Sequence, residues 1–498
     1  MMKFCKVADI TDWHCPNFQT TGALLSLPGR NRKIWEYIQV YNGLNHLGLL
    51  NGKTHALGLG VGTEPLIYAF TNVCQKVVAT DLYNSQNWST ASLPTDAVYQ
   101  ANCFPYERDR LIVQHMDMTH VEYPDESFDF IWSCCSIEHV GTFEELHRVY
   151  QEIHRVLKPG GIAALTTEYN PTDRPSYEPN MLFTDQDWIE KWLTGNQPLI
   201  QGFELLDWPD FNVAIAPENQ PQPKRHQGDA IPFYSGDIVL NSIALFLRKN
   251  GEFSQAYNGD WLPASLRLYL EGCQQQRQGD FLASESTLKV LLQDSLLVPR
   301  LKIAAYRRLI VALKAQKKVE EIVDYCQQVF PLCREAEDPN HLTDLAHYFK
   351  GAGLWEESKS LYERVQILPG SGVNQVIRSF LGQAEYFAHQ NNFQLALNFA
   401  EQAIHLDDFP TSRVVAQAYL SRGTYQQKLG NFSGAMADFR LAIAVAAPHS
   451  SVHEKCQTRL SKCQQILQDR ALSQQNAQPI HFGKLQAMGK HIKNFFQR

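Results

Sequence analysis

A glycine-rich stretch decides the fold of the N-terminal half, and it reads Ala56-Leu57-Gly58-Leu59-Gly60-Val61-Gly62-Thr63-Glu64-Pro65. The apolar run that leads into it predicts a strand over His55–Gly60, and a helical pattern follows Pro65. Glycines between a strand and a helix let the backbone approach a bound cofactor and leave N–H groups free to face it. The stretch therefore predicts a cofactor site at the end of a strand.

Short apolar runs alternate with helical patterns on both sides of this stretch, from Lys53 to Arg248. This alternation indicates an α/β sheet. One helix is expected over Phe143–Leu157, where the turn Lys158-Pro159-Gly160-Gly161 ends it. Strands are expected at His55–Gly60, Val77–Asp81, Leu111–Asp117, Phe128–Cys134, Ile162–Thr167, Phe203–Leu206 and Ile238–Arg248.

Asp81 closes the second of these strands, nineteen residues after Gly62. A carboxylate in that place can accept hydrogen bonds from both ribose hydroxyls of an adenosine cofactor. Nicotinamide dehydrogenases share this feature. However, Pro65 stands where the dinucleotide fingerprint needs its last glycine for close packing of helix on strand, so a nicotinamide oxidoreductase is the weaker alternative.

Further motifs narrow the class of cofactor. Asp117 follows a strand, and three longer motifs come after it: Ser127-Phe128-Asp129-Phe130-Ile131, Ser136-Ile137-Glu138-His139-Val140 and Arg155-Val156-Leu157-Lys158-Pro159-Gly160-Gly161. With the glycine-rich stretch they resemble the class I S-adenosylmethionine-dependent methyltransferases of the broad group called type 11. The resemblance implies a Rossmann-like sheet of strand order 3-2-1-4-5-7-6, counting the seven expected strands along the chain, with Ile238–Arg248 antiparallel.

The resemblance also implies S-adenosyl-L-methionine as the cofactor. No metal site is expected, because the cysteines and histidines form no cluster at zinc spacing. Gly60 and Gly62 would line the methionine part of the cofactor, Asp81 its ribose, and Asp117 with the Met118 backbone its adenine ring. Two positions depart from the family pattern, because Gly58 stands where an acid usually precedes the first glycine and Glu64 replaces the third glycine. The expected cofactor-binding set is Gly58, Gly60, Gly62, Glu64, Asp81, Asp117 and Met118.

Transfer of a methyl group to a hydroxyl requires a base that removes the hydroxyl proton. His139, just past the fourth strand, is the expected general base, with Glu138 beside it. The alternative is that both residues only fill the entrance of the next helix. The long connection Asn84 to Arg110 contains Tyr106-Glu107-Arg108-Asp109-Arg110, which resembles a stretch in methyltransferases that modify glycans or natural products. A glycan or small-molecule hydroxyl is therefore the expected acceptor.

Beyond Asn250 the strand pattern stops and a repeat begins. From Arg422 to Ala447, glycine, alanine and phenylalanine recur at offsets that resemble the tetratricopeptide (TPR) helix–turn–helix repeat. Units at Gly272–Leu291, Ala346–Val365 and Ala384–Ala403 share those offsets, whereas Tyr306–Val329 fits poorly. Small residues occur where paired helices must approach closely. A TPR-type α-solenoid is therefore expected.

These patterns divide the chain into 1–30, an N-terminal extension; 31–250, the methyltransferase domain; 251–260, a linker; 261–470, the TPR-like helical repeats; and 471–498, a basic amphipathic tail. The solenoid is expected to dock a protein or peptide partner and to contribute no catalytic group. The exposed first-helix positions expected to contact that partner are Arg378, Glu385, His389, Gln427 and Lys428. The alternative is that the solenoid only shapes the enzyme or its oligomer.

The composition and charge of the chain limit which other classes of protein it can belong to. Hydrophobic residues make up 44% and charged residues 19%, which supports globular cores. A net charge of −7 gives no global attraction to nucleic acid. The N-terminus lacks a secretory pattern, so a cytoplasmic location is expected, although the tail 481–498 could touch an anionic membrane. The alternative function is a TPR scaffold that retains a degenerate, non-catalytic methyltransferase domain.

Overall fold

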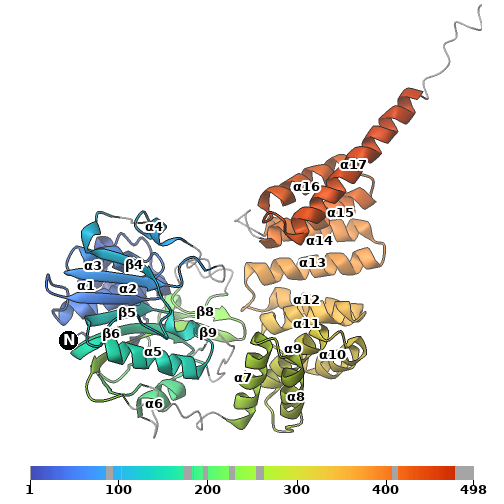
Figure 1. Cartoon of the computed structure of the whole chain (residues 1–498). Helices are drawn as coiled ribbons and strands as arrows, with labels where there is room; N and C mark the ends of the chain where they lie inside the picture. The colour runs from blue at the N-terminus through green and yellow to red at the C-terminus, as the bar shows by residue number, and fades with distance from the viewer. Residues whose placement is uncertain are drawn as a thin grey trace, which may run out of the picture. The chain divides into compact units, whose positions relative to one another are not determined.

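The computed structural model describes residues 2–85, 93–101, 104–172, 182, 184–194, 200–223, 230–253, 263–406 and 413–476. The chain divides into two compact units, Met1–Gly372 and Val373–Arg498. The first unit contains a sheet and a set of helix pairs, and the second contains helices (Figure 1). Most of the expected tail, 471–498, and most of the expected linker, 251–260, lie outside the described residues.

Nine strands form the sheet of the first unit, and its main path runs β1-β9-β6-β5-β2-β3-β4. The strands β2 to β6 are parallel to one another, whereas β9 is antiparallel to β6. The short strand β7 pairs with β9, so the predicted order of seven strands is confirmed. The bounds are β1 Lys6–Val7, β2 His55–Leu59, β3 Lys76–Asp81, β4 Leu111–His115, β5 Phe128–Cys134, β6 Leu157–Tyr169, β7 Phe203–Leu205, β8 Phe233–Ser235 and β9 Ile238–Lys249.

Two features of the sheet differ from the sequence prediction. The first is that residues 1–30 are not separate from it, because β1 pairs with β9 through Lys6 and Val7. The second concerns the expected turn at 158–161, which lies inside β6. There the register between β5 and β6 shifts, and Gly160 has a φ of +75°. A bulge with glycine in the left-handed region allows a strand to start without a separate loop.

Helices cover both faces of the sheet, as a buried parallel sheet requires. On one face, the α2 residues Trp35 and Ile38 pack in a core with Phe130 and Trp132 of β5. On the other face, Val149 and Ile153 of α5 pack with Phe128 and Ile131 of the same strand. The helices of this part are α1 Pro16–Leu24, α2 Arg32–His46, α3 Pro65–Thr71, α4 Thr95–Val98, α5 Phe143–Val156 and α6 Gln186–Thr194.

The remainder of the described chain is helical, which confirms the predicted all-α second half. The first unit ends with α7 Ala264–Arg277, α8 Phe281–Leu292, α9 Pro299–Ala315, α10 Val319–Cys333, α11 Pro339–Gly351 and α12 Trp355–Ile367. The second unit contains α13 Val373–His389, α14 Phe393–His405, α15 Arg413–Lys428, α16 Phe432–Val445 and α17 Ser451–Asn476. Among the described ranges, no helix is long and apolar enough to cross a bilayer.

A left-handed residue sits in the turn of each helix pair from α7 to α16. Its φ is +82° at Gly279, +62° at Lys317, +81° at Gly353, +62° at Asn391 and +85° at Gly430. Glycine adopts this conformation without strain, whereas lysine does so rarely. The poorly matching unit Tyr306–Val329 is therefore also a helix pair, but it has Lys317 in the turn where most other units have glycine.

The first helix pairs share a hydrophobic core with the sheet. Leu266 and Tyr269 of α7 belong to the same buried cluster as Val149 and Tyr150 of α5. A polar contact supports this packing, since Arg300 of α9 lies 2.6 Å from Asp237 in the β8–β9 turn. The boundary between compact units therefore falls inside the helical half, more than a hundred residues after the last strand.

Candidate cofactor and active site

A cavity of about 510 Å³ lies at the carboxyl ends of β2, β3 and β5. Ligands of α/β sheets bind outside the carboxyl ends of the strands, where the connections diverge. Seven predicted site residues line this cavity: Gly60, Gly62, Glu64, Asp81, Asp117, Met118 and His139. Its other lining residues are Lys33, Tyr37, Val61, Thr63, Pro65, Leu82, Met116, Thr119, Cys134, Cys135, Ser136, Val140, Gly141 and Glu145.

The glycine loop leaves room for a ligand at two positions. Gly60 has a φ of +63° and Gly62 a φ of +48°, both in the left-handed region. A Cβ on Gly60 would lie 2.6 Å from the Cβ of Ser136 and 3.0 Å from the Cε of Met118. A side chain here would collide with Ser136, so glycine lets the loop pass close to the opposite wall of the cavity. The backbone therefore forms a cradle that suits a ligand lying against it.

Asp81 is held at the cavity by two backbone donors. The Gly62 N–H donates to its Oδ2 at 2.9 Å, and the Leu82 N–H donates to its Oδ1 at 2.7 Å. Burial raises the pKa of Asp81, and these two N–H groups oppose the rise. Each carboxylate oxygen keeps a second lone pair, so the group can still accept from a pair of ribose hydroxyls.

The residues that follow β4 form a wall of the cavity that contains one carboxylate and two methionine side chains. Asp117 is exposed, and its Oδ1 accepts from both the N–H and the Oγ1 of Thr119 at 2.8 Å. Met116 and Met118 line the cavity beside it. Polarizable sulfur side chains pack well against aromatic rings, and a carboxylate accepts from an amino group. These residues fit an adenine ring.

The two predicted catalytic residues separate in the structure. Both lie in the 3₁₀ turn Ile137–His139, but only His139 lines the cavity. Glu138 is 1% exposed, and its Oε1 accepts from the Glu168 N–H at 3.0 Å. Burial raises the pKa of Glu138. The structure thus places Glu138 outside the cavity, since neighbouring residues of a tight turn point in different directions.

Gly58 is the other predicted site residue that does not line the cavity. It lies within β2, where it pairs with Trp132 of β5. A Cβ on Gly58 would lie 2.5 Å from the Cζ2 of Trp132. The residue therefore makes room for an indole ring inside the sheet.

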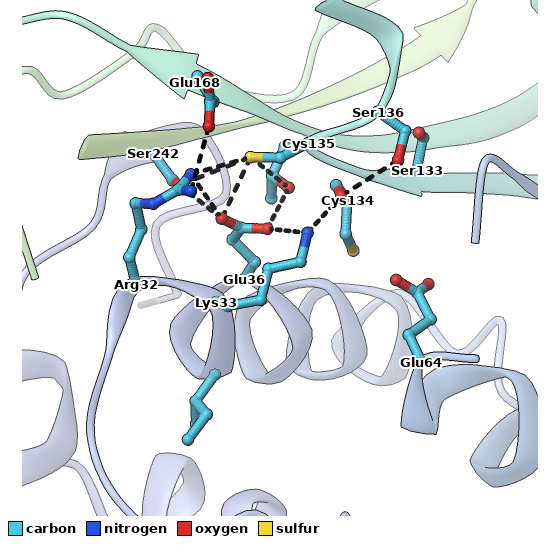
Figure 2. Close-up of polar contacts among 12 residues, drawn as sticks. Arg32, Lys33, Glu36, Glu64, Ser133, Cys134, Cys135, Ser136, Glu168 and Ser242 are labelled. Carbon is cyan, nitrogen blue, oxygen red and sulfur yellow. Dashed lines mark hydrogen bonds and ion pairs between the residues drawn. The ribbon is translucent and has the colours of Figure 1, made fainter. Parts of the chain in front are cut away.

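A charged cluster on α2 supports the end of β5 (Figure 2). Glu36 is fully buried and lies 3.1 Å from Arg32 and 2.9 Å from Lys33. Burial alone would raise the pKa of Glu36, but Lys33 and Arg32 more than offset it and lower the pKa. The Lys33 Nζ donates to the Cys134 carbonyl at 2.5 Å, so the cluster anchors the strand end next to the cavity.

The sequence analysis did not predict this cluster, because its residues lie outside the motifs that carry the family resemblance. The signal that could have revealed it is the spacing of Arg32, Lys33 and Glu36, which places both cations within one turn of the acid. The chain then turns sharply at Cys135, whose φ is +49°, and the Ser136 Oγ donates to the Gly60 carbonyl at 2.7 Å. This contact joins the β5 end to the glycine loop.

Comparisons with known proteins agree with this geometry. A family model described as a methyltransferase domain matches residues 57–165. Over 117 residues, 23% of its length, the chain is 34% identical to the 27-O-demethylrifamycin SV methyltransferase of Amycolatopsis mediterranei (strain S699). The match spans only 39% of that relative's length.

Solved structures of low sequence identity are also similar. The YcgJ protein of Bacillus subtilis is 16% identical and covers 43% of this chain and 99% of its own, with a TM-score of 0.28. A SAM-dependent methyltransferase from Methanosarcina mazei is 17% identical and covers 42% and 98%, also with a TM-score of 0.28. Residues 57–165 therefore match a methyltransferase domain, a family whose cofactor is S-adenosylmethionine.

Proposed function

We propose that the chain transfers the methyl group of S-adenosylmethionine to a hydroxyl of a small molecule or glycan. One observation carries the proposal: His139 lines the same cavity as Gly60, Gly62 and Asp81. A titratable base thus shares a compartment with the expected cofactor-binding residues. The printed name of the Amycolatopsis relative denotes methylation at an oxygen, which supports a hydroxyl acceptor.

When bound, S-adenosylmethionine supplies a methyl group that its sulfonium has already activated. The chain has to hold the acceptor in line and manage one proton. Gly60 and Gly62 seat the methionine part and Asp81 the ribose. When the acceptor oxygen takes up the methyl group and S-adenosylhomocysteine leaves, a ring nitrogen of His139 would accept the hydroxyl proton and pass it to solvent.

The test is calorimetric titration of the full chain with S-adenosylhomocysteine and, separately, with NAD, followed by turnover assays on hydroxylated natural products and glycans. Binding of the first ligand alone and methylated product are expected. His139→Ala should lower turnover about a hundredfold or more and leave S-adenosylhomocysteine affinity unchanged, because the base acts on the acceptor only. A variant with full turnover would limit His139 to a structural role, and cofactor binding without product on any acceptor would favour the scaffold alternative.

We further propose that the TPR-like helices α13 and α15 bind an extended acidic peptide. Of the five positions expected to face a partner, the three exposed ones are basic: Arg378, His389 and Lys428. Glu385 and Gln427 are half-buried, and Gln427 accepts from Arg459 at 3.2 Å. The exposed set is suited to carboxylate side chains of an extended chain.

Fluorescence polarisation with a library of acidic, neutral and basic peptides tests this proposal on the full chain. Acidic peptides should bind, and replacement of Arg378, His389 and Lys428 by alanine together should abolish their binding. Equal binding of all three peptide classes, or retention by the triple variant, would refute the proposed recognition.

A further inference from the structure

Glu64 is an acid in an unusual setting. It precedes α3 at the N-cap position, yet its side chain makes no capping hydrogen bond. It lines the cavity and is only 7% exposed. A buried carboxylate without a role in the helix costs free energy unless something compensates its charge. Its place in the structure therefore points toward a ligand.

Trp132 links Glu64 to the other departure from the family pattern, Gly58. Because Gly58 has no side chain, the fully buried Trp132 indole occupies the space beside it. The indole Nε1 then donates to the Glu64 Oε1 at 2.5 Å. The two departures form one unit, in which the glycine admits the tryptophan and the tryptophan orients the glutamate.

The second carboxylate oxygen is available. Within the described part of the chain, Glu64 Oε2 has no hydrogen-bond or ion-pair partner. The nearby cation Lys33 is committed to Glu36 at 2.9 Å and to the Cys134 carbonyl. Figure 2 shows Glu64 apart from the Arg32–Glu36 cluster, with no dashed line to it. Because Lys33 is already paired, a cation carried by the ligand is a suitable partner for Glu64 Oε2.

We propose that Glu64 Oε2 binds the ammonium of the cofactor's methionine part, and that Trp132 is the positioning residue that aims this carboxylate. The inference rests on S-adenosylmethionine as the cofactor. Glu64 lies two residues from Gly62 in the loop expected to seat the methionine part, so the ammonium is within its reach. A charge-assisted hydrogen bond in a low-dielectric cavity is strong and directional.

Proton release follows from this placement. Burial raises the pKa of Glu64 to about 8, against the lowering effect of Lys33 and Trp132. The free protein therefore holds Glu64 largely protonated at pH 7. A bound ammonium favours the carboxylate, so ligand binding expels a proton, and the affinity rises with pH and levels off only above pH 8.

Calorimetry on the full chain with two ligands tests the proposal. S-adenosylhomocysteine carries the ammonium and no sulfonium, whereas 5′-methylthioadenosine lacks the amino-acid part. At pH 8, Glu64→Gln should weaken S-adenosylhomocysteine binding about tenfold or more and change 5′-methylthioadenosine binding less than about twofold. Trp132→Phe, which removes the Nε1 donor and keeps an aromatic ring, should weaken the first ligand to a smaller extent. Circular dichroism checks that each variant is folded.

Proton release is the second readout. In buffers of different ionisation enthalpy, the natural protein should release a proton on binding S-adenosylhomocysteine at pH 7, and Glu64→Gln should not. Glu144→Gln, which removes an exposed acid paired with Arg148, is the matched control and should behave as the natural protein.

Three results would overturn this inference: equal weakening of both ligands, unchanged S-adenosylhomocysteine affinity in Glu64→Gln, or binding without proton release. The first would make Glu64 a loop-shaping residue. The others would make it a neutral hydrogen-bond donor. If the natural protein bound no S-adenosylhomocysteine at all, the cofactor assignment itself would fail, which is a distinguishable outcome.

Discussion

Two stretches of the helical half have the same helix–turn–helix pattern but different surroundings. Between α7 and α10, buried residues such as Leu266 and Leu309 complete a core that also contains residues of the sheet and α5. Between α13 and α16, residues such as Ala384 and Ala435 fill clusters made by the helices alone. A sequence repeat therefore predicts how the helices pair. The residues that these helices bury determine which domain the helices stabilise.

Truncation tests this difference most strongly. A chain ending after residue 372 should remain folded and bind S-adenosylhomocysteine with nearly natural affinity, because the first compact unit is complete. A chain ending after residue 260 should be insoluble or molten, because it exposes the apolar face that Leu266, Tyr269 and Leu288 cover. Solubility, circular dichroism and calorimetry measure the outcome. A well-folded chain ending after residue 260 would contradict the shared core.

Paired charges provide a second test, since an ion pair with a largely buried aspartate side chain lies in each unit. Arg422 of α15 contacts both carboxylate oxygens of Asp438, at 2.8 and 2.6 Å, and Arg300 contacts Asp237 at 2.6 Å. Asp438→Ala should destabilise the second unit by about 3 kcal/mol, because Arg422 loses its partner. Asp237→Ala should destabilise only the first unit.

Differential scanning calorimetry with and without S-adenosylhomocysteine assigns the transitions, since the ligand should stabilise only the first unit. A single transition that shifts in both variants would show that the two units unfold together.

Cofactor affinity gives a smaller effect that should be confined to one unit. Asp81→Ala should weaken S-adenosylhomocysteine binding by about 2 kcal/mol, because the ribose hydroxyls lose a charged acceptor. The loss should be the same in the full chain and in the chain ending after residue 372. Titration calorimetry measures this loss by comparing Asp81→Ala with the natural sequence, both in the full chain and in the chain ending after residue 372. Unchanged affinity would remove Asp81 from the site, and a loss that depends on the second unit would indicate coupling between units.

The last expected effect is a pH dependence in the absence of ligand. The folded-state pKa of Glu64 is about 8, above its ordinary value of 4.5, so folding favours the protonated form. Stability from this group is present below about pH 4.5 and is lost as pH rises through 8. Between pH 5 and pH 8 the melting temperature of the first unit should fall more in the natural protein than in Glu64→Gln. Parallel pH profiles would show that Glu64 titrates normally.

The sequence by itself determined the sheet and much of the cofactor site. The strand order follows from alternating patterns and a resemblance, and Gly60, Gly62 and Asp81 come together because each lies at or just beyond the end of a parallel strand. Such positions share an edge in any sheet of this order. The helical nature of the second half likewise needs only local periodicity and the turn residues.

Only the tertiary structure decided which side chains face the cavity and where the compact units divide. Glu138 and His139 are adjacent in sequence but separate in space, since a tight turn directs them differently. The contacts of Gly58, Trp132 and Glu64 join residues up to 74 positions apart, and the contact of Lys33 with Cys134 at the end of β5 joins residues 101 positions apart. The packing of α7 against the core of the sheet and α5 also joins distant residues, so a local sequence pattern does not predict it.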